Sequence, residues 1–191
     1  MSEPNASKVP KNTESATMTN TRVRDGSPPD LDVVGALWKA LQGHHEKVGA
    51  SLANVAPFRD LHDSWSKQRR EYEQYLSEPD TILLLADVGN STVGYAMVRS
   101  RQTGPTLALP DPVPHIESLS VLPQYRGQGI GTALLHEVIE RLRSRAAAAV
   151  TVNVFAGNDS ALRLYSRLGF LLYFDALIAP ISPFRPEGSG S

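Results

Sequence analysis

The residues with the clearest chemical potential are three glycines in one short turn, Gly127, Gly129 and Gly131. Because glycine has no Cβ, such a turn lets backbone N–H groups approach a ligand closely. Behind the turn, apolar residues recur at helical spacings from Ile130 onward, which predicts a helix that begins at the turn. The unpaired N–H groups and the positive dipole end of that helix favour an anion such as a diphosphate, and Arg126 adds a positive charge. The alternative is a glycine-rich turn without a ligand.

Spacing separates three kinds of glycine loop that bind phosphates. A P-loop requires a lysine after its last glycine, but Thr132 follows Gly131 and no lysine lies nearby. A dinucleotide fingerprint would require a glycine at position 132, so it matches poorly. The remaining pattern, Arg-x-x-Gly-x-Gly, resembles the coenzyme A motif of the GNAT superfamily of N-acetyltransferases. The resemblance implies that acetyl-CoA binds to Arg126, Gly127, Gln128, Gly129, Ile130, Gly131 and Thr132.

A second segment, residues 158–170, resembles the downstream motif of the same family, in which an asparagine opens a short helix and Gly-Phe closes it. Asn158, or either of the two residues after it, can cap a helix N-terminus, and Gly169 can supply the left-handed residue that ends the helix. The resemblance implies that Asn158 and Tyr165 contact the cofactor and that Tyr165 protonates the departing thiolate. The alternative for Tyr165 is an ordinary half-buried aromatic residue.

Two candidate bases lie at the start of the strand that leads into the glycine turn. An amine acceptor arrives as an ammonium ion and must lose a proton before it attacks, so direct transfer requires a base. Glu117 and His115 are two positions apart and would point to the same face of a strand. We rank Glu117 first; the alternatives are a solvated surface acid and a histidine at the edge of a proline-rich loop. The resemblance further implies that a backbone N–H near the strand's end polarises the thioester carbonyl, among Leu119, Ser120 and Val121.

The pattern of helices and strands predicts a mixed α/β sheet with helices on both faces. The predicted order is β-α-α-β-β-β-α-β-α-β-β, which is also the order of the GNAT fold that the resemblance implies. Asp63 is the predicted cap of the second helix, and residues 89–91 are the predicted turn of a hairpin. The predicted strands comprise residues 21–24, 81–88, 92–99, 115–121, 150–155, 171–174 and 176–181.

Length and composition predict one domain. The chain has 191 residues, of which 41% are hydrophobic. We expect a disordered leader over residues 1–18, a GNAT domain over residues 19–182 and a flexible tail over residues 183–191. A formal net charge of -1 and the lack of a basic run argue against nucleic acid as a partner. The lack of a long apolar run or a signal-peptide pattern argues against a membrane and predicts a cytoplasmic protein.

The residue types and spacings that the sequence lacks exclude several kinds of site. The sequence contains no cysteine, which excludes disulfides, thiolate metal sites and an acyl group carried on a cysteine. None of the five histidines has the spacing that zinc hydrolases use, so no catalytic metal is expected.

The predicted function is transfer of an acetyl group from acetyl-CoA to a primary amine of a small molecule or a peptide, by direct attack in a ternary complex. The alternative is a GNAT-like module that binds acyl-CoA as a sensor without turnover, which would need neither Glu117 nor Tyr165. Homodimers are common in the family, but no interface is evident in the sequence. Six aromatic residues either line an acceptor pocket or belong to the core: Trp38, His44, His45, Phe58, Trp65 and Tyr72.

Overall fold

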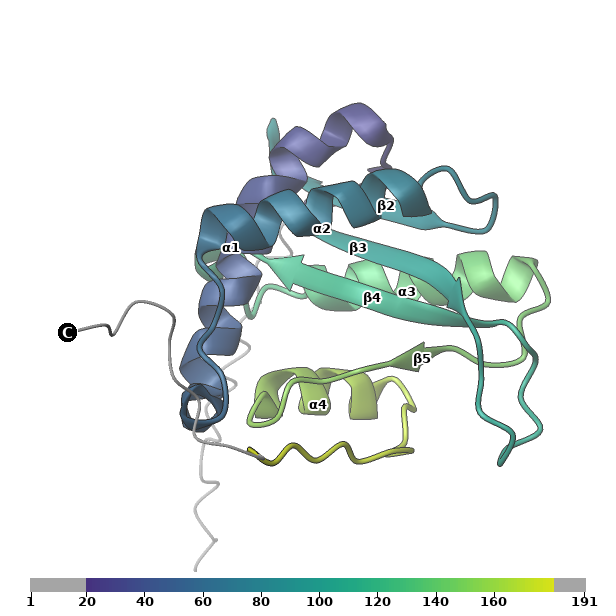
Figure 1. Cartoon of the computed structure of the whole chain (residues 1–191). Coiled ribbons are helices and arrows are strands. Elements are labelled where there is room, and N and C mark those ends of the chain that lie inside the picture. Colours follow the sequence, from purple (N-terminus) through teal and green to yellow (C-terminus); the bar gives the residue numbers. More distant parts are fainter. Residues whose placement is uncertain (1–19, 181–191) are drawn as a thin grey trace, which may run out of the picture.

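A five-stranded sheet forms the centre of the molecule (Figure 1). The computed structural model describes residues 20–180, so the predicted leader and tail lie outside the described residues. The strands lie in the order β1-β2-β3-β4-β5; the first four are antiparallel and β4 pairs with β5 in parallel. They are β1 (Thr21–Asp25), β2 (Ile82–Val88), β3 (Ser91–Arg101), β4 (Val113–Val121) and β5 (Thr151–Val152).

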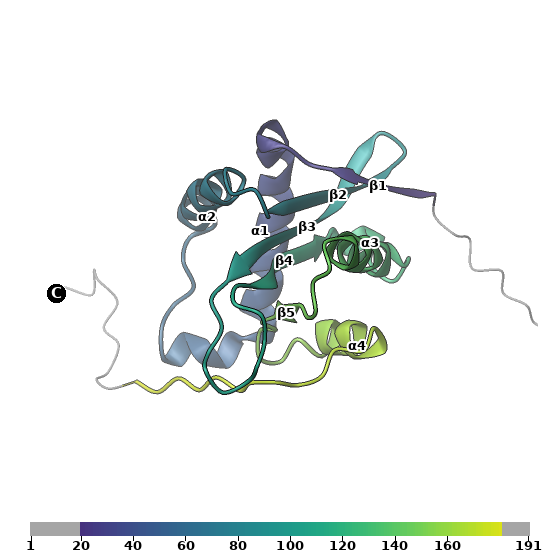
Figure 2. The same cartoon turned by 90° about the vertical axis from the view of Figure 1, so that its right-hand side faces the viewer.

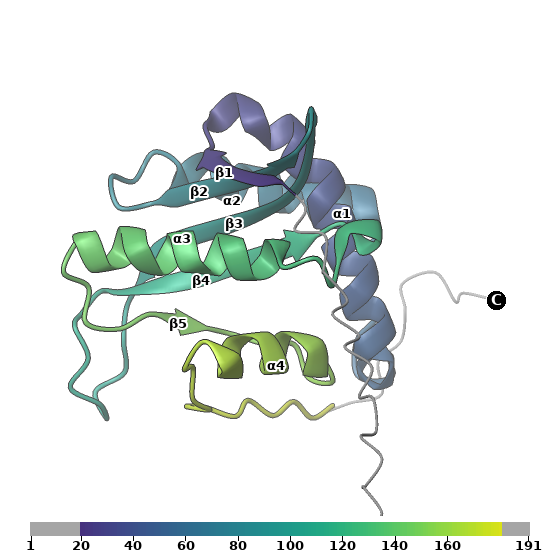
Figure 3. The same cartoon turned by 180° about the vertical axis from the view of Figure 1, so that it is seen from behind.

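Helices cover both faces of the sheet, as predicted. Figure 2 shows α1 and α2 on one side of the sheet and α3 and α4 on the other, and Figure 3 shows α3 running across the rear face. The helices are α1 (Leu31–Val48), α2 (Leu61–Tyr75), α3 (Ile130–Ser144) and α4 (Asp159–Arg167). Three short 3-10 helices, η1 (Pro28–Asp30), η2 (Ala50–Asn54) and η3 (Pro123–Tyr125), lie in the connections.

The sheet separates two hydrophobic cores. In β2, Leu83 and Leu85 pack with α1 and α2, whereas Leu84 and Ala86 pack with α3 and Tyr165 of α4. Because both faces of the strand are buried over residues 82–86, this part of β2 is a continuous apolar run without alternation between apolar and polar residues. The fold is therefore mixed α/β, and burial on both faces holds the central strands in place.

Side-chain caps set the start of two helices. The carboxylate of Asp60 accepts hydrogen bonds from the backbone N–H groups of His62 (2.7 Å) and Asp63 (3.4 Å) at the start of α2. The prediction that Asp63 caps this helix was wrong, because Asp63 lies within the first turn, where its charge favours the helix dipole. Asn158 caps α4 by accepting a hydrogen bond from the N–H of Ala161 at 3.2 Å.

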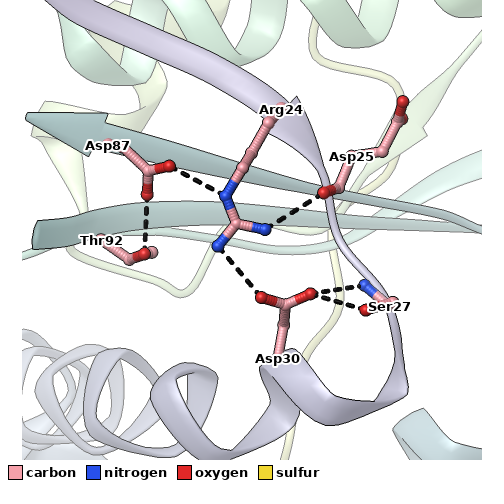
Figure 4. Close-up of polar contacts among 6 residues, drawn as sticks. All are labelled: Arg24, Asp25, Ser27, Asp30, Asp87 and Thr92. Carbon is pink, nitrogen blue, oxygen red and sulfur yellow. Dashed lines mark hydrogen bonds and ion pairs between the residues drawn. The ribbon is translucent and has the colours of Figure 1, made fainter. Parts of the chain in front are cut away.

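A polar cluster holds the end of β1 against the hairpin (Figure 4). The Arg24 guanidinium donates to Asp87 of β2 at 2.8 Å and to Asp30 at 3.0 Å. Thr92 donates to the second oxygen of Asp87 at 2.6 Å, and Asp30 accepts from both the N–H and the hydroxyl of Ser27. These contacts fix η1 and hence the position at which α1 begins.

The last part of the predicted order is not present in the described residues. The predicted strands at 171–174 and 176–181 were wrong: residues 171–180 form neither helix nor strand, and Ile181 lies outside the described residues. Residues with a high strand propensity form a strand only where they can pack against neighbouring strands. Here Leu171, Phe174 and Leu177 expose most of their surface. β5 is likewise two residues long, shorter than the predicted 150–155.

Candidate functional site

The strand β4 contains a bulge at Glu117. Ile116 pairs with Val98 and Ser118 pairs with Met97, so Glu117 is an extra residue without a partner on β3. β4 pairs with β5 only at His115 and Ile116. Beyond this point that edge of β4 has no strand partner among residues 20–180. A bulge of this kind bends a strand and redirects its side chains, and here it lies where β4 and β5 separate.

Glu117 lies on the side of the sheet covered by α1 and α2. Its carboxylate accepts a hydrogen bond from the Nε of Arg99 at 3.0 Å, and both side chains are about one-fifth exposed, at 21%. The Arg99 guanidinium lies over the ring of Tyr75 at 4.4 Å from its centroid. The ion pair orients the carboxylate and leaves it accessible to solvent, which a base that exchanges protons requires.

His115 has both ring nitrogens in hydrogen bonds. Arg101 lies 3.0 Å from Nε2 and the Thr151 hydroxyl lies 2.8 Å from Nδ1. Arginine can only donate, so Nε2 accepts and the Nδ1–H donates to Thr151. Burial, reinforced by the charge of Arg101, lowers the pKa of His115 to about 4. This histidine therefore joins β3, β4 and β5 as a neutral ring, and neither nitrogen is available to an incoming amine.

The glycine turn forms the N-terminus of α3. Gly127 and Gly129 have φ angles of 76° and 83°, in the left-handed region that side-chain-bearing residues rarely adopt. Gly129 is the N-cap residue, and the first turn of α3 has neither a side-chain cap nor an acidic residue. Its N–H groups, from Ile130 onward, are therefore not neutralised by the protein's own carboxylates. This arrangement suits an anionic ligand.

Side chains around the turn brace it against neighbouring elements. The Nε of Arg126 donates to the carbonyl of Val121 at 3.0 Å, and the amide of Gln128 donates to the carbonyl of Gln124 at 3.1 Å. A Cβ on Gly131 would lie 3.3 Å from a methyl group of Leu164, so a glycine here lets α3 approach α4 closely. The Arg126 side chain thus holds the turn against the end of β4. From the sequence, only its positive charge was considered. Thr132 lies in the first turn of α3.

The three residues at the end of β4 face different neighbours. Leu119 packs with the core on the α3 side of the sheet. The hydroxyl of Ser120 is buried and donates to the carbonyl of Leu37 in α1 at 2.9 Å. Val121 is buried in the same core as Leu119. Their side chains are thus committed to packing, which leaves only backbone groups for substrate contacts.

Tyr165 and Asn158 approach from α4, on the opposite side of the sheet from Glu117. Tyr165 is 7% exposed, and its ring lies 5.2 Å from that of Phe170. Burial raises the pKa of its hydroxyl above the ordinary value for tyrosine, at which the group is already protonated at neutral pH. The Oδ1 of Asn158 also lies 3.3 Å from the Nε2 of His44, so the cap ties α4 to α1.

An open pocket of about 290 Å³ lies between the second half of α1, the connection to α2 and the segment after β5. Three of the six aromatic residues left open above line it, namely Trp38, His45 and Phe58. Tyr72 is fully buried in the core, and Trp65 packs against the same core. Sequence reasoning missed Gln42 and Phe155, which belong to no motif; the full lining consists of Trp38, Gln42, His45, Pro57, Phe58, Arg59, Ser64 and Phe155.

Within residues 20–180, we find neither a cluster of metal-ligating side chains nor a membrane-spanning helix. No group of three or more histidine, aspartate or glutamate side chains there could hold a metal ion. None of the helices α1 to α4 is long and apolar enough to cross a bilayer.

Solved structures share this fold at low sequence identity. A GCN5-related N-acetyltransferase from Ralstonia eutropha superposes with a TM-score of 0.67 at 19% identity, covering 85% of this chain and 99% of that one. An aminoglycoside antibiotic 6'-N-acetyltransferase from Acinetobacter baumannii gives a TM-score of 0.58 at 20% identity, with 84% and 100% covered. These similarities concern the fold.

Sequence comparison identifies the family. An N-alpha-acetyltransferase of Sulfurisphaera tokodaii is 36% identical over 106 residues, which are 52% of this chain and 62% of the relative. A mycothiol acetyltransferase of Propionibacterium freudenreichii is 26% identical over 162 residues, 84% of this chain and 46% of the relative. The chain thus spans less than two-thirds of the length of these relatives. Residues 51–170, more than half of the chain, match the model of the acetyltransferase (GNAT) family, and the protein therefore belongs to that family.

Proposed function

We propose that the protein transfers an acetyl group from acetyl-CoA to a primary amine of a small molecule or a peptide, by direct attack in a ternary complex. The observation that carries the proposal is the bulge at Glu117, where β4 and β5 separate beside the glycine turn. A substrate in that gap has Glu117 on one side of the sheet and Tyr165 on the other. Membership of the GNAT family supports the same reaction.

The glycine turn fits the diphosphate of acetyl-CoA. Gly127 and Gly129 hold the backbone in left-handed conformations, and the first turn of α3 offers N–H groups with no acidic residue beside them. Acetyl-CoA supplies the acetyl group as an activated thioester. We place the thioester carbonyl against the end of β4, where a backbone N–H from Leu119 to Val121 donates to it.

Glu117 and Tyr165 divide the proton transfers between them. Glu117 accepts the proton of the acceptor's ammonium group, directly or through water, and its negative charge attracts that cation. The neutral amine then forms the N–C bond, and the C–S bond breaks. Tyr165, whose hydroxyl is protonated at neutral pH, gives its proton to the departing thiolate. Because the chain has no cysteine, no covalent acetyl-cysteine can take part.

A thiol-release assay with acetyl-CoA and a panel of amines tests the proposal. The panel comprises aromatic amines, amino acids, polyamines, aminoglycosides and peptides. We expect release that depends on the acceptor and saturates with it. Tight binding of acetyl-CoA without acceptor-dependent release from any class would instead favour the non-catalytic acyl-CoA-binding module.

A further inference from the structure

The guanidinium of Arg101 is a partly buried charge without an acidic partner. The only hydrogen bond of this side chain within residues 20–180 is the one to the Nε2 of His115, at 3.0 Å. That ring is neutral at pH 7, because burial and the charge of Arg101 lower its pKa to about 4. Asp111, the acid closest to Arg101 in sequence, accepts from the N–H of Thr103 instead. A guanidinium has five N–H donors, so most of them, and the whole charge, are available to a ligand.

Arg101 and Arg99 make two similar contacts beside each other. They are two positions apart on β3 and therefore point to the same face of the sheet, the one that α1 and α2 cover (Figure 2). Arg99 pairs across the sheet with His115, and its side chain reaches two positions further along β4, to Glu117. Arg101 pairs with Val113, and its side chain likewise reaches two positions further, to His115. The first contact is an ion pair, whereas the second joins a cation to a neutral ring.

The charged groups of both contacts lie near the end of α2. The Arg99 guanidinium lies over the ring of Tyr75, the last residue of α2, at 4.4 Å from its centroid. Burial and the charge of Glu117 raise the pKa of the Tyr75 hydroxyl, and the charges of Arg99 and Arg101 lower it. Glu71, one turn earlier in α2, raises this pKa too, but it makes no ion pair within residues 20–180. The carboxylate of Glu117 and both guanidinium groups are thus close enough to act on one side chain together.

The balance of charge around His115 favours an acceptor with an anionic group. The charges that act on the pKa of this ring are those of Arg101, Glu117 and Arg99, two positive and one negative. Because Glu117 and Arg99 form an ion pair, the excess positive charge is that of Arg101. A second ammonium group on the acceptor would be repelled there, whereas a carboxylate would find a counter-ion. Arginine also binds a carboxylate through two parallel hydrogen bonds, which fix its orientation.

The spacing of the two contacts indicates the length of the acceptor. Two residues along a strand span roughly 7 Å. Because both arginines reach along β4 in the same direction, we expect a similar distance between the carboxylate of Glu117 and the guanidinium of Arg101. An extended four-carbon amino acid with its amine at the far end holds nitrogen and carboxylate oxygen about 6 Å apart. An α-amino acid has both groups on one carbon and is too short to reach both side chains.

We infer that Arg101 binds a carboxylate of the acceptor, and that the acceptor is a short amino acid with its amine and its carboxylate at opposite ends. The ammonium group lies at Glu117, beside the point where β4 and β5 separate, and the carboxylate lies at Arg101. His115 is a positioning residue, because its neutral ring orients the guanidinium without neutralising it. The inference rests on the proposed function, because it names the acceptor class for that reaction.

Calorimetric titration of the full chain with three amines tests the binding claim. Coenzyme A is present throughout, because it has no acetyl group to transfer. The amines 4-aminobutanoate, 4-aminobutanamide and 1,4-diaminobutane share a four-carbon chain and differ in the charge of the far end. We expect 4-aminobutanoate to bind about tenfold more tightly than the amide, the size expected of a charge-assisted hydrogen bond, and the diamine to bind most weakly. Equal affinities for the first two, tighter binding of the diamine or no binding of 4-aminobutanoate would overturn the inference.

Variants of Arg101 locate the preference for the carboxylate. Arg101→Met and Arg101→Gln both remove the charge and should reduce the ratio of the two affinities to about one, whereas Arg101→Lys keeps the charge and should keep part of the preference. Arg22→Met also removes one positive charge, at an exposed position of β1 on the edge of the sheet, and should keep the full preference. Thermal unfolding checks that each variant is folded. A preference that survives in folded Arg101→Met or Arg101→Gln would leave Arg101 with a purely structural contact and contradict the assignment.

Thiol release measured with acetyl-CoA and the same three amines separates the two proposals. Binding with the expected preference but without any thiol release would support the role of Arg101 and contradict the transferase proposal. Amine-dependent release with equal kcat/KM for 4-aminobutanoate and 4-aminobutanamide, unchanged in Arg101→Met, would support the transferase proposal and contradict the role of Arg101.

Discussion

At the scale of single residues, the two candidate bases differ in the contacts they already make. Glu117 has one ion pair and a partly exposed carboxylate, whereas His115 has both nitrogens occupied and a lowered pKa. A base needs a free lone pair that can reach the substrate. The contacts therefore favour Glu117 as the base and give His115 a structural role.

Tyr165→Phe tests the proposed acid, because the substitution removes only the hydroxyl. Without its proton the thiolate leaves less readily, so we expect kcat to fall by about tenfold or more while the Kd of acetyl-CoA changes little. Steady-state kinetics and a binding titration measure the two effects. Tyr173→Phe, at an exposed tyrosine outside the site, is the control. An unchanged kcat in Tyr165→Phe would remove the tyrosine from the mechanism.

The lowered pKa of His115 predicts a loss of stability in mild acid. Its pKa is about 4 in the folded chain and about 6.5 when unfolded, so between these values the unfolded state binds more protons. The free energy of unfolding should therefore fall by about 2 kcal/mol from pH 7 to pH 5 through this residue alone. His45, whose pKa is also lowered, adds in the same direction.

Denaturant titrations of His115→Gln at pH 7 and pH 5 measure that contribution. The variant should lose less stability on acidification than the wild type does, and His136→Gln, at an exposed histidine, should behave as the wild type. Equal acid sensitivity in His115→Gln and the wild type would contradict a buried, neutral His115.

At the scale of elements, the start of α3 combines a backbone requirement with a proposed binding role. Gly129→Asp places a negative charge where the diphosphate is proposed to bind, at a position with a φ of 83° and no heavy atom within 4 Å of where a Cβ would lie. Gly89→Asp in the β2–β3 turn is the matched control, with a φ of 58° and equally open surroundings. Both changes should cost a similar, small amount of stability, about 1 kcal/mol.

Only Gly129→Asp should weaken binding of acetyl-CoA, by roughly tenfold or more, because charge repulsion replaces a favourable helix terminus. Titration of both variants with acetyl-CoA and with coenzyme A measures this. An undiminished affinity in Gly129→Asp would show that the diphosphate binds elsewhere.

Elements with a local sequence signal could be predicted from the sequence, whereas features that depend on a distant strand could not. The apolar spacing after Ile130 and the Gly89-Asn90 turn are local signals, and the predicted α3 and hairpin are confirmed. The bulge at Glu117 depends on how β4 aligns with Met97 and Val98 of another strand, so no local pattern in β4 reveals it. Asp63 was predicted as the cap of α2, but the helix begins earlier in the chain, at Leu61, and Asp60 caps it.

At the scale of the whole molecule, the open pocket beside α1 assembles parts that are distant in sequence. Gln42 and Phe155 are separated by more than half of the chain's length and meet because the segment after β5 packs against α1. Gln42 belongs to no motif, so no local pattern marked it as a pocket residue. The glycine turn was recognisable because its residues are nearly consecutive, whereas the pocket is visible only in the folded chain.

The arrangement of the molecule also predicts the order of events. The two substrates are proposed to reach the gap beside β4 from different sides, acetyl-CoA from the start of α3 and the amine from the side of Glu117, so both can be bound together. The sequence offers no cysteine to hold the acetyl group between two half-reactions. A ternary complex should therefore form before transfer.

The most direct test of the central claim is the initial rate of thiol release over a grid of acetyl-CoA and amine concentrations. We predict release that requires the amine, with double-reciprocal lines that intersect, as a ternary complex requires. Parallel lines would instead indicate a covalent acetyl-enzyme intermediate. No amine-dependent release at any point of the grid would contradict acetyl transfer itself.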